Sequence, residues 1–210
     1  MIDHERHEVS IVMELGGLDL VQYIIDMKNQ VHDFYELVKN VVIGAARALQ
    51  ECHQKNIIHL DIKPENFVIS REQNNNSNEI VSKLIDFGFS IKQNTHLSGN
   101  RGTLGYIAPE FFRRNRNIGF KADVYSFGVL VYKLEHSLED NIVSARRGTR
   151  LRFVDIHSQM AAFTNINEIG DGFNTTYKRL NHRCIENSPA DRPQLRDVIA
   201  FLEGNKYDLY

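Results

Sequence analysis

Two short segments hold the polar residues whose types and spacing could do chemistry. Residues 59–66 read His-Leu-Asp-Ile-Lys-Pro-Glu-Asn, which places Asp61, Lys63 and Asn66 in one stretch, and Asp86 follows an apolar run further along the chain. Carboxylate and amide oxygens suit a hard divalent cation. The alternative interpretation is that Asp61 and Asp86 are turn-forming aspartates that flank a hairpin.

Apolar periodicity predicts the elements that position these two segments. Between Phe34 and His53 apolar side chains recur at three- and four-residue steps, which predicts a long amphipathic helix that ends near Asn56. The apolar runs 67–69 and 83–85 are separated by a polar stretch rich in asparagine, which predicts a hairpin. Residues 59–66 are therefore expected to connect a helix to a hairpin.

The remaining patterns predict one more strand and several helices. Alternation from Val9 to Glu14 predicts a strand, which Gly16 and Gly17 then end. Nearly every residue from Ala122 to Leu134 is apolar, so this helix is expected to lie in the middle of the domain. Further helices are predicted near residues 18–28, 175–186 and 193–204, the last opened by Pro193.

Composition predicts one ordinary globular domain. The chain has 210 residues, of which 42% are hydrophobic and 25% charged, and its formal net charge is -2. This charge gives no electrostatic footprint for nucleic acid or an anionic membrane. Two distant cysteines, no apolar run of membrane-spanning length and no signal-peptide pattern after Met1 lead us to expect a soluble, cytoplasmic protein.

Three motifs that occur in order resemble those of eukaryotic-type protein kinases. Residues 59–66, Asp86-Phe87-Gly88 and Ala108-Pro109-Glu110 are similar to the catalytic loop, the magnesium loop and the end of the activation segment. The resemblance covers about residues 9–202. It implies a hinge region at 9–17, a catalytic loop at 59–66 and an activation segment at 86–110.

The resemblance also implies the fold. We expect a single, partial kinase domain over residues 1–210, of α+β class but mainly α. It would be the large helical lobe of a kinase, with a small β-hairpin beside the catalytic loop and a remnant hinge strand.

Roles for the polar residues follow from the same resemblance. Asp61 would be the catalytic base and Lys63 would contact the transferring phosphate, while Asn66 and Asp86 would hold the Mg²⁺ ions that accompany ATP. Phosphoryl transfer makes sense of this set, because a hydroxyl must be oriented while metal ions neutralise charge on the phosphates.

Two loops resemble serine/threonine kinases rather than tyrosine kinases. These are Lys63-Pro64-Glu65-Asn66 and the segment from Gly102 to Tyr106. In such kinases a threonine placed like Thr103 bonds the catalytic aspartate and lysine. The plainer interpretation is an ordinary turn threonine.

Three further features of the family have matches here. Asp123 resembles the residue that accepts N–H bonds from the catalytic loop, although an N-cap would need the same residue type. Glu110 and Arg192 match a buried ion pair, and unpaired burial of either would be costly. His59 and Phe87 resemble two members of a regulatory stack, or are plain core residues.

The nucleotide-binding residues are implied by weaker similarity. Met13-Glu14-Leu15-Gly16 resembles the hinge that meets adenine through backbone groups, with Met13 as gatekeeper, and Val68 resembles the residue under the adenine ring. Apolar residues at these positions would fit a core equally well.

The sequence departs from the family in two places. It contains no Gly-x-Gly-x-x-Gly loop and no Val-Ala-x-Lys strand, so residues 1–210 alone are expected to bind Mg-ATP weakly and to show no appreciable kinase activity. Leu60 stands where the catalytic-loop motif usually has arginine. Without that arginine, the usual phosphate switch on the activation segment is not expected.

Two hypotheses about function follow. The first is a kinase that transfers phosphate from ATP to serine or threonine in protein substrates, which explains the intact Asp61, Lys63, Asn66 and Asp86. The second is a truncated, non-catalytic pseudokinase-like module that binds a partner. Small-molecule kinases are disfavoured because they lack the Ala-Pro-Glu segment. The sequence predicts neither the peptide substrate nor the oligomeric state.

Overall fold

The computed structural model describes residues 2–3, 8–9, 11–71, 79–95, 101–113, 118–144, 173–206 and 208–209. Long helices dominate this part of the chain, and its strands form small two-stranded sheets. The predicted α+β, mainly helical class is therefore confirmed. Among the described residues, no helix has both the length and the apolar character needed to cross a membrane.

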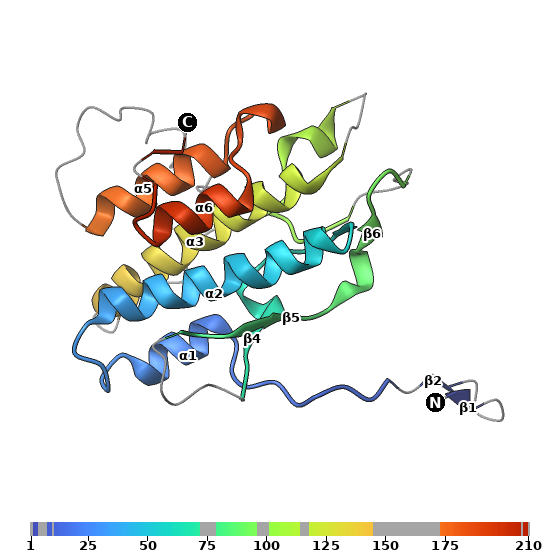
Figure 1. The fold of residues 1–210 in the computed structure, drawn as a ribbon. Coiled ribbons are helices and arrows are strands. Elements are labelled where there is room, and N and C mark those ends of the chain that lie inside the picture. The colour runs from blue at the N-terminus through green and yellow to red at the C-terminus, as the bar shows by residue number, and fades with distance from the viewer. Residues whose placement is uncertain are drawn as a thin grey trace.

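Helix α2, Phe34–Gln54, forms one side of the core and matches its prediction closely. The Asp33 side chain caps its first turn by accepting a hydrogen bond from the Glu36 N–H at 3.0 Å. Its apolar stripe is buried, and the chain leaves the helix through Asn56 in the left-handed conformation, φ 57°. In Figure 1 it runs across the middle of the molecule, beside α3.

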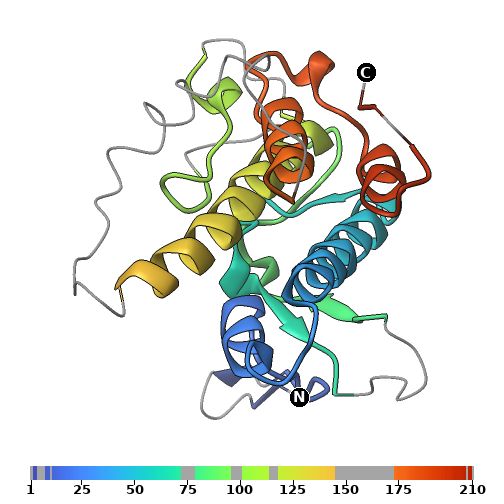
Figure 2. The same cartoon turned by 90° about the vertical axis from the view of Figure 1, so that its left-hand side faces the viewer.

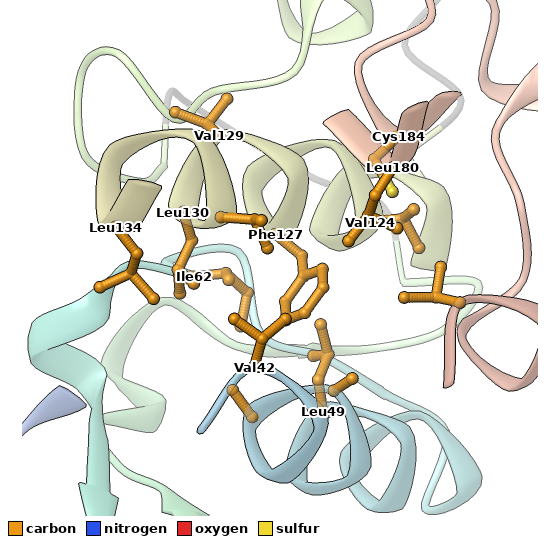
Figure 3. Packing of buried hydrophobic residues seen from close by; sticks show 14 of the residues in the cluster. Val42, Leu49, Ile62, Val124, Phe127, Val129, Leu130, Leu134, Leu180 and Cys184 are labelled. Atoms are coloured by element: carbon orange, nitrogen blue, oxygen red, sulfur yellow. The ribbon is translucent and has the colours of Figure 1, made fainter. Parts of the chain in front are cut away.

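Helix α3, Phe120–Ser144, is the central element. Every residue from Ala122 to Tyr132 is buried, as the absence of a polar stripe predicts. Figure 3 shows Phe127 directed from α3 toward Val42 and Leu49 of α2, while Val124 lies beside Leu180 and Cys184 of α5. Helix α3 therefore joins two helical layers into one core.

Helices α5, Phe173–Cys184, and α6, Leu195–Leu202, complete the helical part. Helix α5 packs on α3, and α6 packs on α2. Figure 2 shows this arrangement, with α3 between α5 and the two strands formed by residues 67–69 and 82–84. The prediction that Pro193 opens the last helix is wrong, because the N-cap is Gln194 and the helix begins at Leu195.

The hairpin is confirmed. Strands β4, Phe67–Ile69, and β5, Ser82–Leu84, pair antiparallel with Val68 opposite Lys83. The asparagine-rich stretch at 72–78, predicted to connect the two strands, lies outside the described residues. Helix α1, Leu20–Met27, packs beside the hairpin and is capped by Asp19, whose side chain accepts from the Gln22 N–H at 2.9 Å.

A second pair of strands was not predicted. Strand β3, Ile57–Ile58, pairs antiparallel with β6, Ile91–Lys92, and so joins the start of segment 59–66 to segment 86–110. We keep for these two segments the names that the resemblance implies, the catalytic loop and the activation segment. Short 3-10 helices occupy Pro64–Asn66, Phe87–Phe89, Pro109–Phe112 and Pro189–Asp191.

The predicted strand from Val9 to Glu14 is wrong. Strand β2 is Glu8–Val9 and pairs with β1, Ile2–Asp3, whereas residues 11–18 belong to no strand. Alternation alone does not make a strand, because its backbone groups need a partner strand. The side chains of Ile11, Val12 and Met13 are 76% exposed or more.

Candidate active site

A buried aspartate fixes the start of the catalytic loop. The Asp123 carboxylate accepts hydrogen bonds from the backbone N–H groups of His59 and Leu60, both at 2.8 Å. His53 Nε2 lies 2.9 Å from Asp123 Oδ2. The predicted anchoring role is thus confirmed, and the N-cap interpretation is wrong because Asp123 lies inside α3, three residues after Phe120.

The anchored loop holds Leu60 in an unusual conformation. Its φ is 67°, a left-handed value that a bulky residue rarely adopts and that costs about 1–3 kcal/mol. The activation segment also approaches closely, since a Cβ added at Gly102 would lie 2.6 Å from the Leu60 carbonyl oxygen. The Leu60 side chain is buried, so it packs in the core.

Four predicted site residues meet at the Asp61 carboxylate. Thr103 Oγ1 donates to Asp61 Oδ1 at 2.6 Å, and Lys63 Nζ lies 2.8 Å from Asp61 Oδ2. Lys63 also donates to Thr103 Oγ1 at 3.0 Å. Asn66 Nδ2 donates to both the side chain and the carbonyl of Asp61, at 2.9 and 2.7 Å.

This network sets the charge of Asp61. Burial alone would raise its pKa, but hydrogen bonds from Lys63, Thr103 and Asn66, together with the Lys63 charge, outweigh burial and hold the pKa below its usual value. Asp61 is therefore ionised at neutral pH. Its carboxylate is held in one orientation by partners from the catalytic loop and the activation segment.

Asp86 is tied to the same loop through its neighbour. The Ile85 N–H donates to the Asn66 carbonyl at 2.9 Å, and His59 Nε2 lies 3.0 Å from the Ile85 carbonyl. Asp86 itself is left-handed, φ 59°, which an aspartate tolerates, and it accepts from the Gly88 N–H at 3.2 Å. The Phe87 ring meets the His59 ring edge-on, with centroids 5.0 Å apart.

The donor set at Asn66 and Asp86 fits a hard cation. The Asn66 amide nitrogen makes both hydrogen bonds to Asp61, so the amide oxygen is the atom of this side chain that could hold a metal. The Asp86 side chain is exposed and offers carboxylate oxygens. Mg²⁺ is usually held by one or two such protein oxygens together with substrate phosphates.

The predicted adenine-binding residues are only partly brought together. The Gly17 N–H donates to the Ile69 carbonyl, and the Ile69 N–H donates to the Leu18 carbonyl, both at 2.8 Å. This places Gly16 against Val68, since a Cβ at Gly16 would lie 2.8 Å from Val68 Cγ2.

The other two residues, Met13 and Glu14, precede Gly16 in the chain. Glu14 pairs with Lys83, the cross-strand neighbour of Val68. Met13 lies among residues 11–18, which belong to no strand, and it is 76% exposed.

The predicted buried ion pair is present. Arg192 donates to both carboxylate oxygens of Glu110, at 2.7 and 2.8 Å, and both residues are 4% exposed or less. Arg192 also donates to the carbonyls of Glu186 and Lys121 at 2.8 Å. The pair ties the end of the activation segment to the segment before α6.

Sequence reasoning missed two residues at the site. His53 is the third partner of Asp123, and its position at the end of a predicted helix gave no signal of this contact. Ser126 donates from α3 to the Tyr106 carbonyl at 2.7 Å and so supports the activation segment beside Thr103. As one serine in an apolar run, it was not singled out.

Comparison with known proteins identifies the family. The chain matches the protein kinase domain family over residues 2–201. It is 30% identical over 192 residues to the Arabidopsis thaliana leaf rust 10 disease-resistance locus receptor-like protein kinase-like 2.2, covering 79% of this chain and 28% of that protein.

Two other relatives from the same plant agree with this match. A probable leucine-rich repeat receptor-like serine/threonine-protein kinase is 30% identical over 80% of the chain and 17% of its own length. A PR5-like receptor kinase is 28% identical over 96% of the chain and 32% of its length. The chain thus spans less than a third of these curated relatives, and it belongs to the protein kinase domain family, of the eukaryotic type.

Proposed function

We propose that the protein containing this chain transfers the terminal phosphoryl group of ATP to serine or threonine hydroxyls of protein substrates. The observation that carries this proposal is the Asp61 network, in which the side chains of Lys63, Thr103 and Asn66 each lie within 3.0 Å of a carboxylate oxygen of Asp61. Family membership and the receptor-like serine/threonine-kinase relatives support the same class of reaction.

Asp61 would orient the attacking hydroxyl. Its carboxylate is ionised and fixed, and among the described residues Oδ1 accepts a hydrogen bond from Thr103 alone, which leaves that oxygen able to accept a second one from a substrate hydroxyl. Orientation is the main demand of phosphoryl transfer, since the protein does little covalent chemistry. The proton of the hydroxyl would pass to an Asp61 oxygen.

Lys63, together with a metal held by Asn66 and Asp86, would offset the negative charge of the ATP phosphates. The Lys63 ammonium already lies between Asp61 and Thr103, so it stands beside the expected path of the transferred group. Asn66 and Asp86 would hold Mg²⁺, which would neutralise charge on the phosphates of ATP. Gly16, Glu14, Met13 and Val68 would contact the adenine side of the nucleotide.

The alternative, a non-catalytic interaction module, is supported by Leu60, which stands where the catalytic-loop motif usually has arginine. The site geometry favours catalysis. A module that only binds partners has no need for a buried Asp61 with a threonine on one carboxylate oxygen and a lysine on the other.

The test is transfer of labelled phosphate from Mg-ATP by the full-length protein, followed by identification of the labelled amino acid. We expect phosphoserine or phosphothreonine. Thr103→Ser should keep most of the rate, whereas Thr103→Val, which keeps the shape but loses the hydroxyl, should lower kcat by roughly 10–100-fold. Phosphotyrosine as the product, or equal rates for both variants, would contradict the proposal.

A further inference from the structure

The molecule has a pocket whose lining includes no residue of the Asp61 network. It has a volume of about 580 Å³ and is formed where the end of α2, the start of α3 and the start of α6 come together. This volume falls within the usual range of small-molecule sites. Its apolar wall is made by Phe120, Val124 and Leu195.

The polar lining of this pocket has one sign of charge. Lys121 and Arg196 are cationic, and His53 and four glutamines add hydrogen-bonding groups. Among the described residues, no aspartate or glutamate lines the pocket. The nearby carboxylate of Asp197 is held by Lys206 at 3.0 Å.

The environment of Lys121 disfavours its own positive charge. Partial burial lowers the pKa of Lys121, the neighbouring Arg192 lowers it further, and Asp197 and Cys184 act in the opposite direction. Its ammonium donates to the backbone carbonyls of Arg192 and Pro193. An anion in the pocket would supply the negative charge that the lining does not contain.

The pocket is connected to the catalytic loop through two successive residues, His53 and Asp123. His53 lines the pocket, and its Nε2 lies 2.9 Å from Asp123 Oδ2. The same Asp123 carboxylate accepts the N–H groups of His59 and Leu60. A ligand that fixes the His53 ring, which already contacts the Phe120 ring in a tilted arrangement with centroids 4.6 Å apart, would therefore act on the loop that carries Asp61.

We propose that this pocket binds a small organic anion, a phosphate or carboxylate on a flat apolar body, and that its occupation stiffens the catalytic loop through His53 and Asp123. The apolar body would lie on the Phe120 wall, and the anion would face Lys121 and Arg196. The proposal concerns binding and does not depend on phosphoryl transfer.

Gly119 offers a way to close the pocket without strain. It lines the pocket, its φ is not left-handed, and a Cβ added there would meet no heavy atom of the described residues within 4 Å. Gly119→Trp should therefore fill the space, whereas Gly119→Ala should leave it open. Arg196→Gln removes one charge from the pocket lining, and Arg179→Gln removes the charge of another exposed arginine, on α5, as its control.

The probes are 2-naphthyl phosphate and 2-naphthoate, titrated by calorimetry into the purified protein beside 2-naphthol and inorganic phosphate. We expect the two naphthyl anions to bind with Kd on the order of 0.1–1 mM. 2-Naphthol, which has no charge, and inorganic phosphate, which has no apolar body, should each bind at least about tenfold more weakly. Binding should disappear in Gly119→Trp, persist in Gly119→Ala, and weaken about five- to tenfold in Arg196→Gln but not in Arg179→Gln.

The link to the catalytic loop has its own readout. Amide hydrogen exchange at His59 and Leu60 should slow on addition of 2-naphthyl phosphate to the wild-type protein and stay unchanged in Gly119→Trp. Failure of both anions to bind a folded protein, equal binding to Gly119→Trp, or equal binding of 2-naphthol would overturn the site. Binding without any change in exchange at the two amides would overturn the regulatory link.

Discussion

At the scale of single residues, the site is a set of buried charges that hold one another. Asp61 and Asp123 are both 3% exposed or less, and each is surrounded by donors. Leaving a buried charge without its partner costs far more than the pair contributes. The sequence predicted the pairing of Glu110 with Arg192 through family resemblance alone, because no local pattern links residues 82 positions apart.

The Glu110–Arg192 pair predicts a large effect of a single substitution. Arg192→Ala should lower the free energy of unfolding by roughly 3–5 kcal/mol, because Glu110 would remain charged and buried without a partner. Thermal and urea unfolding measure this change. The double variant Glu110→Leu/Arg192→Met should lose less than Arg192→Ala. A single variant as stable as the wild type would contradict the burial of the pair.

At the scale of elements, the sequence predicted what is local and missed what depends on partners. Helix α2 was predicted from the spacing of its apolar residues and the buried part of α3 from its continuous apolar run, because both patterns lie within one short stretch of sequence. The strand at 9–14 was wrong because residues 11–18 find no partner strand in the described part of the chain. Strands β3 and β6 were missed because each has two residues and their pairing spans more than thirty positions.

The contact between α3 and α5 gives a prediction at this scale. A Cβ added at Gly128 would lie 2.6 Å from Cys184 Cβ and 3.0 Å from Ile185 Cγ2. Gly128→Ala should therefore destabilise the protein by about 1–3 kcal/mol through overpacking, although alanine favours a helix. The matched control is Gly119→Ala, where the added methyl group meets open space. Equal melting temperatures for the two variants would mean that the helices are not packed this closely.

At the scale of the whole molecule, one continuous core supports the site. Residues from α2, α3, α5 and α6 belong to a single buried cluster, and Ile62 of the catalytic loop is part of it (Figure 3). The catalytic loop is therefore positioned by global packing as well as by Asp123. The order of the motifs along the chain was enough to indicate the family. The distances within the site depend on how distant segments pack, and these distances could not be predicted from the sequence.

The two cysteines report on this core. Burial raises the pKa of Cys52 to about 12, with a further contribution from the Asp123 charge, and burial raises the pKa of Cys184 to about 12. Both are free thiols. A thiol reagent at pH 8 should react with the native protein about 100-fold more slowly than with the unfolded chain, which should titrate both. Fast labelling of Cys184 in the native state would show that α5 separates from α3.

The measurement that tests the central claim most directly is phosphate transfer from Mg-ATP to a protein substrate by the full-length protein and its Asp61→Asn and Asp86→Asn variants. Each variant should lower kcat by at least about 100-fold, the first through loss of hydroxyl orientation and the second through loss of a metal ligand. The control Asp208→Asn, at an exposed aspartate outside the site, should transfer at the wild-type rate. Wild-type turnover by either site variant would contradict the assignment of the Asp61 network as the catalytic centre.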